Sequence, residues 1–378
     1  MKIVADDKIP FLKEGLAKFA DSVNAVFLPG AKIAKSDLLD ADALITRTRT
    51  KCNRDLLEGT KVRFIASATI GYDHIDTAYC KSRNIFWTNA PGCNSSSVAQ
   101  YFASAILNLA NERKFRLRDM TIGIVGVGNV GSKIAKFAEA TGMTVLLNDP
   151  PRERKEGRGI FTDLGTIKCE ADIISFHVPL TNDGSYRTLH LAGENFFREI
   201  FRRIIFVNSS RGEVADTGAL KNAIRNGKVS DAVIDVWENE PDIDRELLEI
   251  AKLATPHIAG YSTDGKANGT SMCIRALSTF FGLGADEWYP EKLPEPECPL
   301  IKIDCSGKTA EQVLLEAINA SYDISQDDLV LRNSPERFEK LRGEYPVRRE
   351  FPAYSVKLKN DTADFGGIIK RLGFILHV

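Results

Sequence analysis

The chain has 378 residues, 43% of them hydrophobic and 27% charged, which is the composition of a globular protein long enough for two or three domains. Its 50 lysines and arginines nearly balance its 51 aspartates and glutamates, so no excess positive charge would attract nucleic acid or an anionic membrane. We therefore expect a protein that acts on small molecules.

Up to about residue 89, short apolar runs alternate with polar, helix-compatible stretches, the pattern of an α/β unit. The predicted strands are Ile3–Val4, Ala25–Leu28, Ala43–Thr46, Val62–Ala66 and Ile85–Thr88. A long helix is predicted over Ser95–Lys114, because its apolar residues recur at three- and four-residue spacing.

From Thr121 to about Thr255, strand and helix signals alternate again. The strand candidates are nearly continuous apolar runs, which indicates strands buried on both faces of a parallel sheet. They are Ile122–Val125, Val145–Leu147, Ile173–Phe176, Ile204–Val207 and Val233–Val236. Another helix, Asp264–Phe281, is expected to pack on the first unit.

The proline-rich stretch from Trp288 to Leu300 predicts a stiff, extended linker. Strand, helix, strand, helix and strand signals follow it and predict a third, small α/β domain. These elements are Ile301–Asp304, Glu311–Ala320, Tyr354–Leu358, Phe365–Arg371 and Phe374–Val378.

A glycine-rich motif, Gly126-Val127-Gly128-Asn129-Val130-Gly131, follows a predicted strand and opens a helix. In that setting a G-x-G-x-x-G predicts a dinucleotide site: its glycines permit a tight turn, approach of backbone amides to a pyrophosphate, and close helix–strand packing. Asp149 ends the next strand, eighteen positions after the last glycine, and would accept hydrogen bonds from the ribose while repelling a 2′-phosphate. NAD is therefore favoured over NADP; an ordinary turn beside an exposed acid is the alternative.

Three residues after predicted strands could serve the oxidation of a hydroxy acid. Such chemistry needs a base, a group that orients the base, and a cation for the carboxylate or developing carbonyl. His257, Glu240 and Arg211 offer this set. Taken singly, each residue has a simpler explanation. His257 would be a loop histidine satisfied by a hydrogen bond, Glu240 a solvated turn residue, and Arg211 part of a surface ion pair.

The seven cysteines are scattered and show no C-x-x-C spacing, which argues against disulfides or a zinc site and favours a reducing cytoplasm. The N-terminus lacks the basic and apolar regions of a signal peptide, and no apolar run approaches the roughly 20 residues that span a bilayer. We therefore expect a cytoplasmic protein without a metal site.

Over residues 40–285 the chain resembles the D-isomer-specific 2-hydroxyacid dehydrogenases. The resemblance is carried by the glycine motif and by the segments Asn208–Gly212, Asp235–Pro241 and Pro256–Gly260. It implies two Rossmann-like, doubly wound parallel-sheet domains with a cleft between them, plus a small C-terminal α/β dimerisation domain. The implied domains are 1–94 with 257–285 for substrate, 95–256 for NAD and 286–378 for dimerisation.

The same resemblance implies the roles of individual residues. His257 becomes the acid/base, Glu240 its hydrogen-bond partner and Arg211 the clamp on the substrate carboxylate or carbonyl, roles that suit an imidazole beside a carboxylate and a planar guanidinium fork. Further NAD contacts are implied for Ser209, Ser210, Asp235, Gly260 and, through its backbone, Val178.

For the substrate, the resemblance implicates Thr48, Thr69 and Tyr261. Further motifs, among them Pro91–Asn94, Asp149–Pro151 and Asp183–Tyr186, narrow the expectation to a family member that oxidises a small phosphorylated 2-hydroxy acid as a homodimer. Arg47 or Lys51 is the candidate for holding the phosphate, with a solvated basic face as the alternative. Two other functions stay open: oxidation of a different acid, such as 3-phosphoglycerate, or reduction of hydroxypyruvate; and NAD sensing without catalysis.

Overall fold

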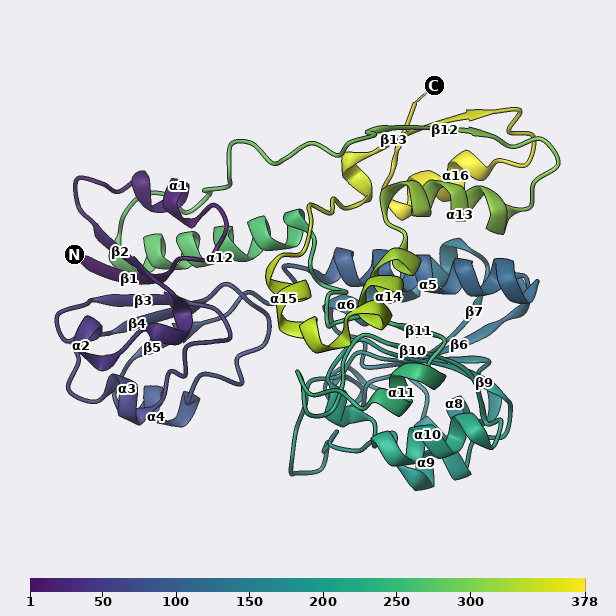
Figure 1. The fold of residues 1–378 in the computed structure, drawn as a ribbon, viewed down its shortest axis with the longest axis horizontal. Coiled ribbons are helices and arrows are strands. Elements are labelled where there is room, and N and C mark those ends of the chain that lie inside the picture. Colours follow the sequence, from purple (N-terminus) through teal and green to yellow (C-terminus); the bar gives the residue numbers. More distant parts are fainter. Residues whose placement is uncertain (378) are drawn as a thin grey trace. The chain divides into compact units, whose positions relative to one another are not determined.

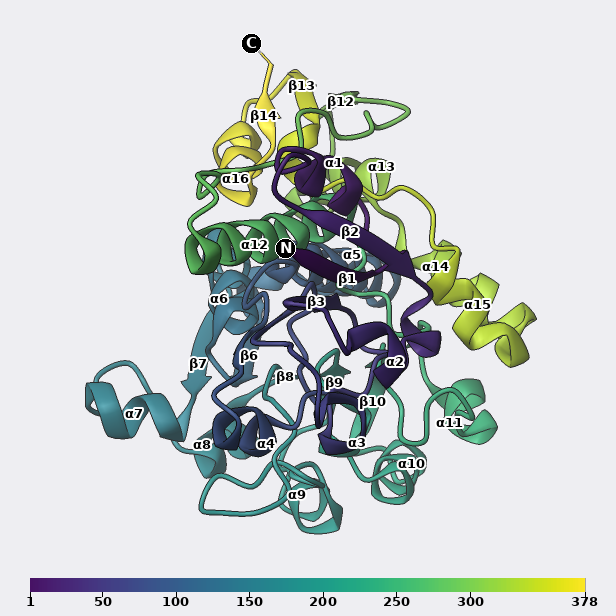
Figure 2. The ribbon, with the colours of Figure 1, turned by 90° about the vertical axis from the view of Figure 1, so that its left-hand side faces the viewer.

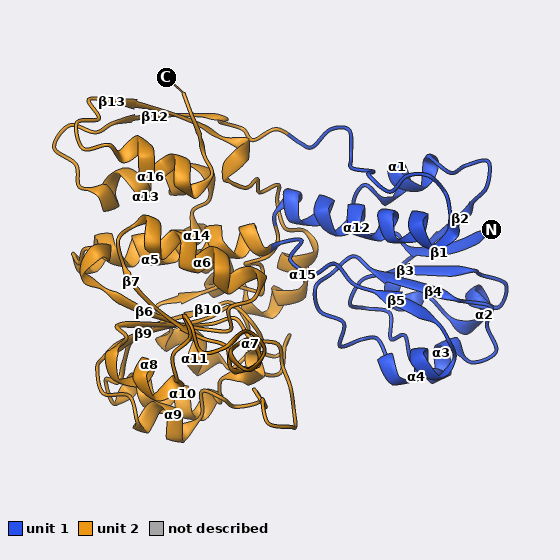
Figure 3. Ribbon diagram, turned by 180° about the vertical axis from the view of Figure 1, so that it is seen from behind, with its two compact units in different colours: residues 1–94, 262–294 blue, residues 95–261, 295–378 orange. Residues whose placement is uncertain are grey.

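The computed structural model describes residues 1–377. The chain folds into two compact units. Residues 1–94 and 262–294 form the first unit, and residues 95–261 and 295–378 form the second (Figure 3). Among the described residues, no helix is both long and apolar enough to cross a membrane.

The first unit is built on a five-stranded parallel sheet in the order β2-β1-β3-β4-β5 (Figure 1). Side chains of one face pack against α1 and α12, and those of the other face pack against α2, α3 and α4. The strands are β1 (Lys2–Asp6), β2 (Asn24–Leu28), β3 (Ala43–Thr46), β4 (Phe64–Ser67) and β5 (Phe86–Thr88). The helices are α1 (Leu12–Ala17), α2 (Lys35–Leu38), α3 (Arg54–Leu57), α4 (Thr77–Ser82) and α12 (Thr263–Phe281).

The second unit contains a six-stranded parallel sheet in the order β11-β10-β9-β8-β6-β7. Successive residues of its strands point to opposite faces, and both faces are buried: Ile205 packs on the side of α5 and α6, and Phe206 on the side of α8 to α11. The strands are β6 (Thr121–Val125), β7 (Thr144–Asn148), β8 (Ile173–Phe176), β9 (Ile204–Asn208), β10 (Val229–Ile234) and β11 (Leu253–Ala254).

The helices beside this sheet are α5 (Ser95–Arg113), α6 (Asn129–Ala140), α7 (Pro150–Glu156), α8 (Leu164–Glu170), α9 (Glu194–Arg198), α10 (Thr217–Arg225) and α11 (Arg245–Ile250). The chain leaves β6 for β7 on one side and then returns to β8 on the other. In open α/β sheets, ligands bind at the carboxyl ends of the strands at such a reversal of strand order.

The C-terminal part of this unit adds a three-stranded parallel sheet, β12-β13-β14, with further helices. The elements are β12 (Leu300–Asp304), α13 (Ala310–Ser321), α14 (Ile324–Asn333), α15 (Phe338–Gly343), β13 (Ser355–Lys359), α16 (Phe365–Leu372) and β14 (Ile375–Leu376). Short 3-10 helices occur at Gly30–Lys32, Leu117–Asp119, Gly212–Val214, Pro335–Arg337 and Phe351–Ala353.

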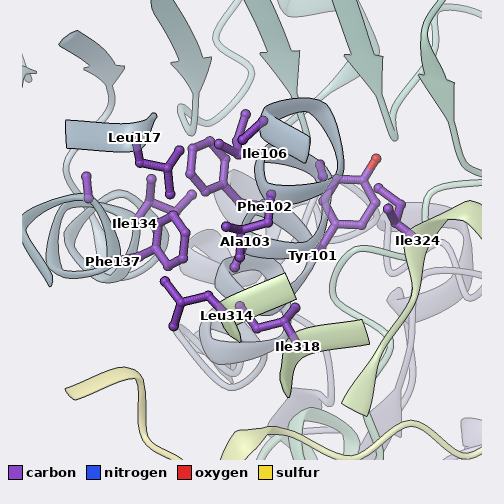
Figure 4. Packing of buried hydrophobic residues seen from close by; sticks show 14 of the residues in the cluster. Tyr101, Phe102, Ala103, Ile106, Leu117, Ile134, Phe137, Leu314, Ile318 and Ile324 are labelled. Carbon is purple, nitrogen blue, oxygen red and sulfur yellow. The ribbon is translucent and has the colours of Figure 1, made fainter. Parts of the chain in front are cut away.

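The C-terminal part packs on the large sheet's helix layer through one continuous core. Figure 4 shows Phe102 of α5 near Ile134 and Phe137 of α6, with Leu314 and Ile318 of α13 in the same cluster. The rings of Phe102 and Phe137 meet edge to face, with centroids 5.8 Å apart. Figure 1 places α14 beside β11, where Asp328 accepts a hydrogen bond from Ala254 N at 2.7 Å and covers the sheet edge. Figure 2 shows α14 followed by α15 along the chain.

The predicted fold class of Rossmann-like parallel-sheet domains with a small C-terminal α/β domain is confirmed. The prediction was wrong for four elements. Strand β10 runs over Val229–Ile234 instead of Val233–Val236, and both β11 and the helices α14 and α15 were missed. The last predicted strand, Phe374–Val378, ends on a residue outside the described ones.

The compact units change at residues 261/262 and 294/295, whereas the predicted domains changed at 256/257 and 285/286. Residues 257–261 stay with the second unit because Asp235 holds their backbone: it accepts hydrogen bonds from Ile258 N and Ala259 N.

Candidate active site

The glycine motif forms the turn between β6 and α6, and its three glycines are needed for different reasons. Gly126 has a φ of 92°, and a Cβ there would lie 2.5 Å from the carbonyl oxygen of His177. A Cβ on Gly131 would lie 2.0 Å from the Gly126 oxygen, whereas a Cβ on Gly128 would meet nothing within 4 Å. The first and third glycines therefore permit packing inside the protein, and the second leaves open space before the N-terminus of α6, where Asn129 and Val130 begin the helix.

Asp149 lies at the end of β7 and is the N-cap of α7. One carboxylate oxygen accepts a hydrogen bond from Arg152 N at 3.1 Å, and the other accepts one from Val127 N at 2.8 Å. Asp149, which is predicted to bind the ribose, thus also connects α7 to the glycine turn. An aspartate directly before two prolines was the sequence signal for this cap, since proline suits the first helical position.

The loops after β9, β10 and β11 meet at one edge of the sheet. Asp235 N donates to Asn208 O at 3.0 Å, and His257 N donates to Asp235 O at 2.7 Å. Asn208 also donates from its side chain to Arg211 O at 2.9 Å. A Cβ on Gly212 would lie 2.0 Å from the Trp237 carbonyl, so the loop of Arg211 packs directly on the loop that leads to Glu240.

His257 and Glu240 form a hydrogen-bonded pair. The Nδ1 of His257 lies 2.8 Å from Oε2 of Glu240, whose other oxygen accepts from Trp237 N at 2.9 Å. Burial alone would raise the pKa of Glu240, but the hydrogen bond and charge of His257, the Trp237 amide and the charge of Arg342 together lower it. The pair leaves the other ring nitrogen of His257 to exchange a proton with a substrate.

The backbone of His257 is held in a left-handed conformation, with a φ of 57°. Non-glycine residues rarely adopt it, and the surrounding contacts must fix it. Asp235, only 1% exposed, accepts hydrogen bonds from Ile258 N, Ala259 N and the Thr255 hydroxyl. Burial raises the pKa of Asp235 despite these bonds and the nearby His257. Asp235 therefore supports the loop of His257, and its contact with the cofactor stays a prediction.

Further predicted NAD ligands lie near these loops. Ser210 is buried and donates from its hydroxyl to Asn208 at 2.8 Å, and Arg211 donates from Nη1 to the Ser210 carbonyl at 2.8 Å. Within residues 1–377, the buried hydroxyl of Ser209 has no hydrogen-bond partner. Val178 packs against the glycine turn, where a Cβ on Gly126 would lie 2.8 Å from its Cγ1, and Gly260 is half-buried. An unpartnered hydroxyl and an open glycine cradle fit the binding of a dinucleotide.

The predicted substrate residues of the first unit follow β3 and β4, whose ends are joined by a hydrogen bond from Ala68 N to Thr46 O at 2.9 Å. The Thr69 hydroxyl lies 2.7 Å from the Ser67 hydroxyl and donates to Gly71 O at 3.0 Å. Thr48 and Lys51 are exposed, and Arg47 donates to Lys8 O at 3.3 Å. Their roles toward substrate and phosphate, like that of Tyr261 in the second unit, stay predictions.

Sequence reasoning missed a charged residue of the C-terminal part at this site. Nη1 of Arg342 lies 3.9 Å from Oε2 of Glu240, the oxygen that pairs with His257. Arg342 lies in α15, a short polar helix without a recognisable motif, so no signal in the sequence could have found it.

This chain is similar to known proteins over nearly its whole length. A family model described as D-isomer specific 2-hydroxyacid dehydrogenase, NAD binding domain, matches residues 98–259, and a domain of unknown function (DUF3410) matches residues 293–370. The erythronate-4-phosphate dehydrogenase of Bacteroides thetaiotaomicron is 55% identical over 94% of this chain and 99% of its own. The enzyme of that name from Porphyromonas gingivalis is 42% identical over 99% and 100%.

Among solved structures, D-lactate dehydrogenase of Aquifex aeolicus, complexed with NAD and lactic acid, covers 78% of this chain and 100% of its own with a TM-score of 0.63 and 25% identity. The NAD-bound 3-phosphoglycerate dehydrogenase of Entamoeba histolytica has a TM-score of 0.62 at 24% identity and covers 78% and 99%. At 24% identity, the similarity to the 3-phosphoglycerate dehydrogenase supports the fold alone.

Proposed function

Because this chain belongs to the erythronate-4-phosphate dehydrogenases, within the D-isomer-specific 2-hydroxyacid dehydrogenases, we propose that it oxidises 4-phospho-D-erythronate with NAD to (R)-3-hydroxy-2-oxo-4-phosphooxybutanoate. This reaction serves the synthesis of pyridoxal 5′-phosphate. The predicted family, the class of NAD-dependent oxidoreductase and the cofactor are confirmed by these relatives. The roles of individual residues are part of the proposal.

The observation that carries the proposed chemistry is the 2.8 Å pair of His257 and Glu240, at the carboxyl edge of the sheet whose first strand leads into the glycine motif. His257 takes the proton of the substrate's C2 hydroxyl on the ring nitrogen that does not face Glu240. Glu240 fixes the ring and stabilises the imidazolium that results. Arg211, in the adjoining loop, holds the substrate carboxylate in its planar fork.

When bound, NAD supplies the acceptor for the hydride that leaves C2 of the substrate. The open backbone around Gly128 and the first amides of α6, at Asn129 and Val130, would hold the pyrophosphate. Asp149 would accept from the adenosine ribose, and Ser209 would donate its unpartnered hydroxyl to the cofactor.

We test the proposal with His257→Ala, using His377→Ala, an exposed histidine near the C-terminus, as the control. Since general acid–base groups contribute about 10²–10⁴-fold, His257→Ala should lower kcat by at least a hundredfold and leave the NAD dissociation constant within about twofold. A kcat equal to that of the control would show that another group accepts the proton, whereas a control that binds NAD but shows no turnover would favour a protein that senses NAD without catalysis. If kcat/KM is higher for 3-phosphoglycerate than for 4-phosphoerythronate, then 3-phosphoglycerate replaces 4-phosphoerythronate as the proposed substrate.

Three finer points complete the proposal. Arg47 or Lys51 binds the substrate phosphate, the chain acts as a homodimer, and it works in the cytoplasm. The polar loop after β3 and the position of Lys51 at its exposed end favour the first point. Light scattering checks the second, because a dimer would have twice the 41.8 kDa of one chain.

A further inference from the structure

The C-terminal part of the chain contacts the residues proposed for proton transfer. Arg342 of α15 lies with Nη1 3.9 Å from Oε2 of Glu240 and 3.0 Å from Oε1 of Glu339. That oxygen of Glu240 is the one that pairs with Nδ1 of His257. One oxygen of the carboxylate is therefore close to two groups that can carry positive charge, one from the sheet loops and one from the C-terminal part.

The guanidinium of Arg342 is held in place by aromatic rings as well as by charge. Its central carbon lies 5.8 Å from the ring centroid of Tyr261 and 5.8 Å from that of Phe338. Tyr261 also meets Tyr345 edge to face at 5.9 Å. The Arg342 side chain is 19% exposed, and a guanidinium packed in this way loses little freedom in contacting Glu240.

A second arginine of the same segment fixes the loop after His257. Arg348 is 4% exposed, donates to the carbonyls of Ile258 and Ala259, and lies over the ring of Tyr322 at 4.3 Å. Asp235 accepts the N–H groups of the same two residues. The backbone beyond the left-handed His257 is thus held from both sides, and one of those sides belongs to the C-terminal part.

We propose that Arg342 is a positioning residue of the hydride-transfer site: its charge keeps Glu240 ionised and oriented toward His257. The proposal rests on the proposed function and extends it, because it makes the C-terminal part a contributor to catalysis. Arg342 acts through Glu240 and has no assigned contact with substrate.

The charges around the pair determine the expected effect of removing Arg342. Asp235 and Arg348 both hold the backbone after His257, and Glu339 pairs with the same Nη1 of Arg342 that approaches Glu240. Tyr322 and Tyr345 donate to the half-buried Asp327, which lies among the groups around Arg348. Arg211 follows in the adjoining loop. Arg342, like His257, is a cation within 4 Å of the Glu240 carboxylate, so without Arg342 the pair should bind a proton at higher pH.

The experiment compares Arg342→Gln and Arg342→Lys with Arg337→Gln. Arg337 is an exposed arginine five positions earlier whose side chain makes no hydrogen bond or ion pair within the described chain. For each full-length variant, kcat, KM and the pH profile of kcat/KM are measured with 4-phosphoerythronate and NAD. If Arg342→Gln does not fold, Arg342→Met replaces it as the neutral variant, with the same outcomes.

The neutral variant should lower kcat about five- to fiftyfold, with KM within about twofold, since a misplaced catalytic group costs rate more than binding. The acid limb of its pH profile should move up by about 0.5–1 pH unit. Arg342→Lys, which keeps the charge, should recover most of the lost rate and restore the wild-type limb, whereas Arg337→Gln should match the wild type throughout.

Three results would overturn the inference. A neutral variant that matches Arg337→Gln in kcat and pH profile would show that the charge is irrelevant to the pair. Equal losses in the neutral variant and Arg342→Lys would assign Arg342 to packing alone, and a raised KM at unchanged kcat would make it a substrate ligand. A wild type that fails to oxidise 4-phosphoerythronate would contradict the proposed function itself, which separates the two failures.

Discussion

At the scale of single residues, His177 shows how burial changes the chemistry of a side chain. Its Nε2 lies 2.7 Å from the Ser175 hydroxyl, and burial lowers the pKa of His177 to about 3. The folded protein therefore keeps the ring neutral at pH values where an unfolded chain, with an ordinary histidine pKa near 6.5, binds a proton. We therefore expect a structural role for this histidine, in contrast to His257, which pairs with a carboxylate.

A pH dependence of stability follows from this difference. The contribution of a neutral His177 is complete above about pH 6.5 and declines toward pH 3 by about 1.4 kcal/mol per pH unit. His177→Gln, which cannot titrate, should show a shallower loss of unfolding free energy between pH 7 and pH 5, measured by urea denaturation. Exposed His377→Gln is the control and should keep the wild-type slope; equal slopes in all three proteins would contradict the assignment.

At the scale of elements, the turn from β6 into α6 separates glycines needed for folding from a glycine needed for the ligand. Gly131→Ala would place a Cβ 2.0 Å from the Gly126 carbonyl, so the unfolding free energy should fall by about 2–3 kcal/mol. Gly128→Ala meets open space and should fold with near wild-type stability. Its added methyl would occupy the approach to the pyrophosphate, so NAD binding should weaken at least tenfold in calorimetry. Wild-type NAD affinity in Gly128→Ala would place the phosphates elsewhere.

The elements also show what the sequence could and could not predict. The strands of the large sheet were found because both faces are buried, which gives continuous apolar runs such as Ile204–Val207. Helix α14 was missed because it buries only Ile324 and Leu331 within a largely polar run. Strand β11 has two residues and no pattern of its own.

The features of the candidate site also fall into two groups, those that a local motif predicts and those that it does not. Gly126, Asp149, Arg211, Glu240 and His257 could be chosen as candidates because motifs place them after strands. The left-handed backbone of His257 and the approach of Arg342 to Glu240 depend on contacts between segments far apart in the chain, which no local pattern encodes.

At the scale of the whole molecule, one of the two buried cores of the second unit includes both the NAD-binding sheet and the C-terminal part. Leu314 of α13 is 1% exposed and belongs to the same buried cluster as Phe102 of α5 and Ile124 of β6. This packing makes the stability of the large sheet depend on α13.

Leu314→Ala tests this dependence, since truncating a buried leucine costs about 2–5 kcal/mol. If the core is one cooperative unit, hydrogen exchange should accelerate to a similar degree in amides of β6 and β9 and in amides of β12 and β13. Leu329→Ala, on an α14 leucine that is 53% exposed, should change neither set. Loss of protection confined to β12 and β13 would mean that the C-terminal part unfolds by itself, and Arg342 would then sit on an element that can leave Glu240 while the sheet stays folded.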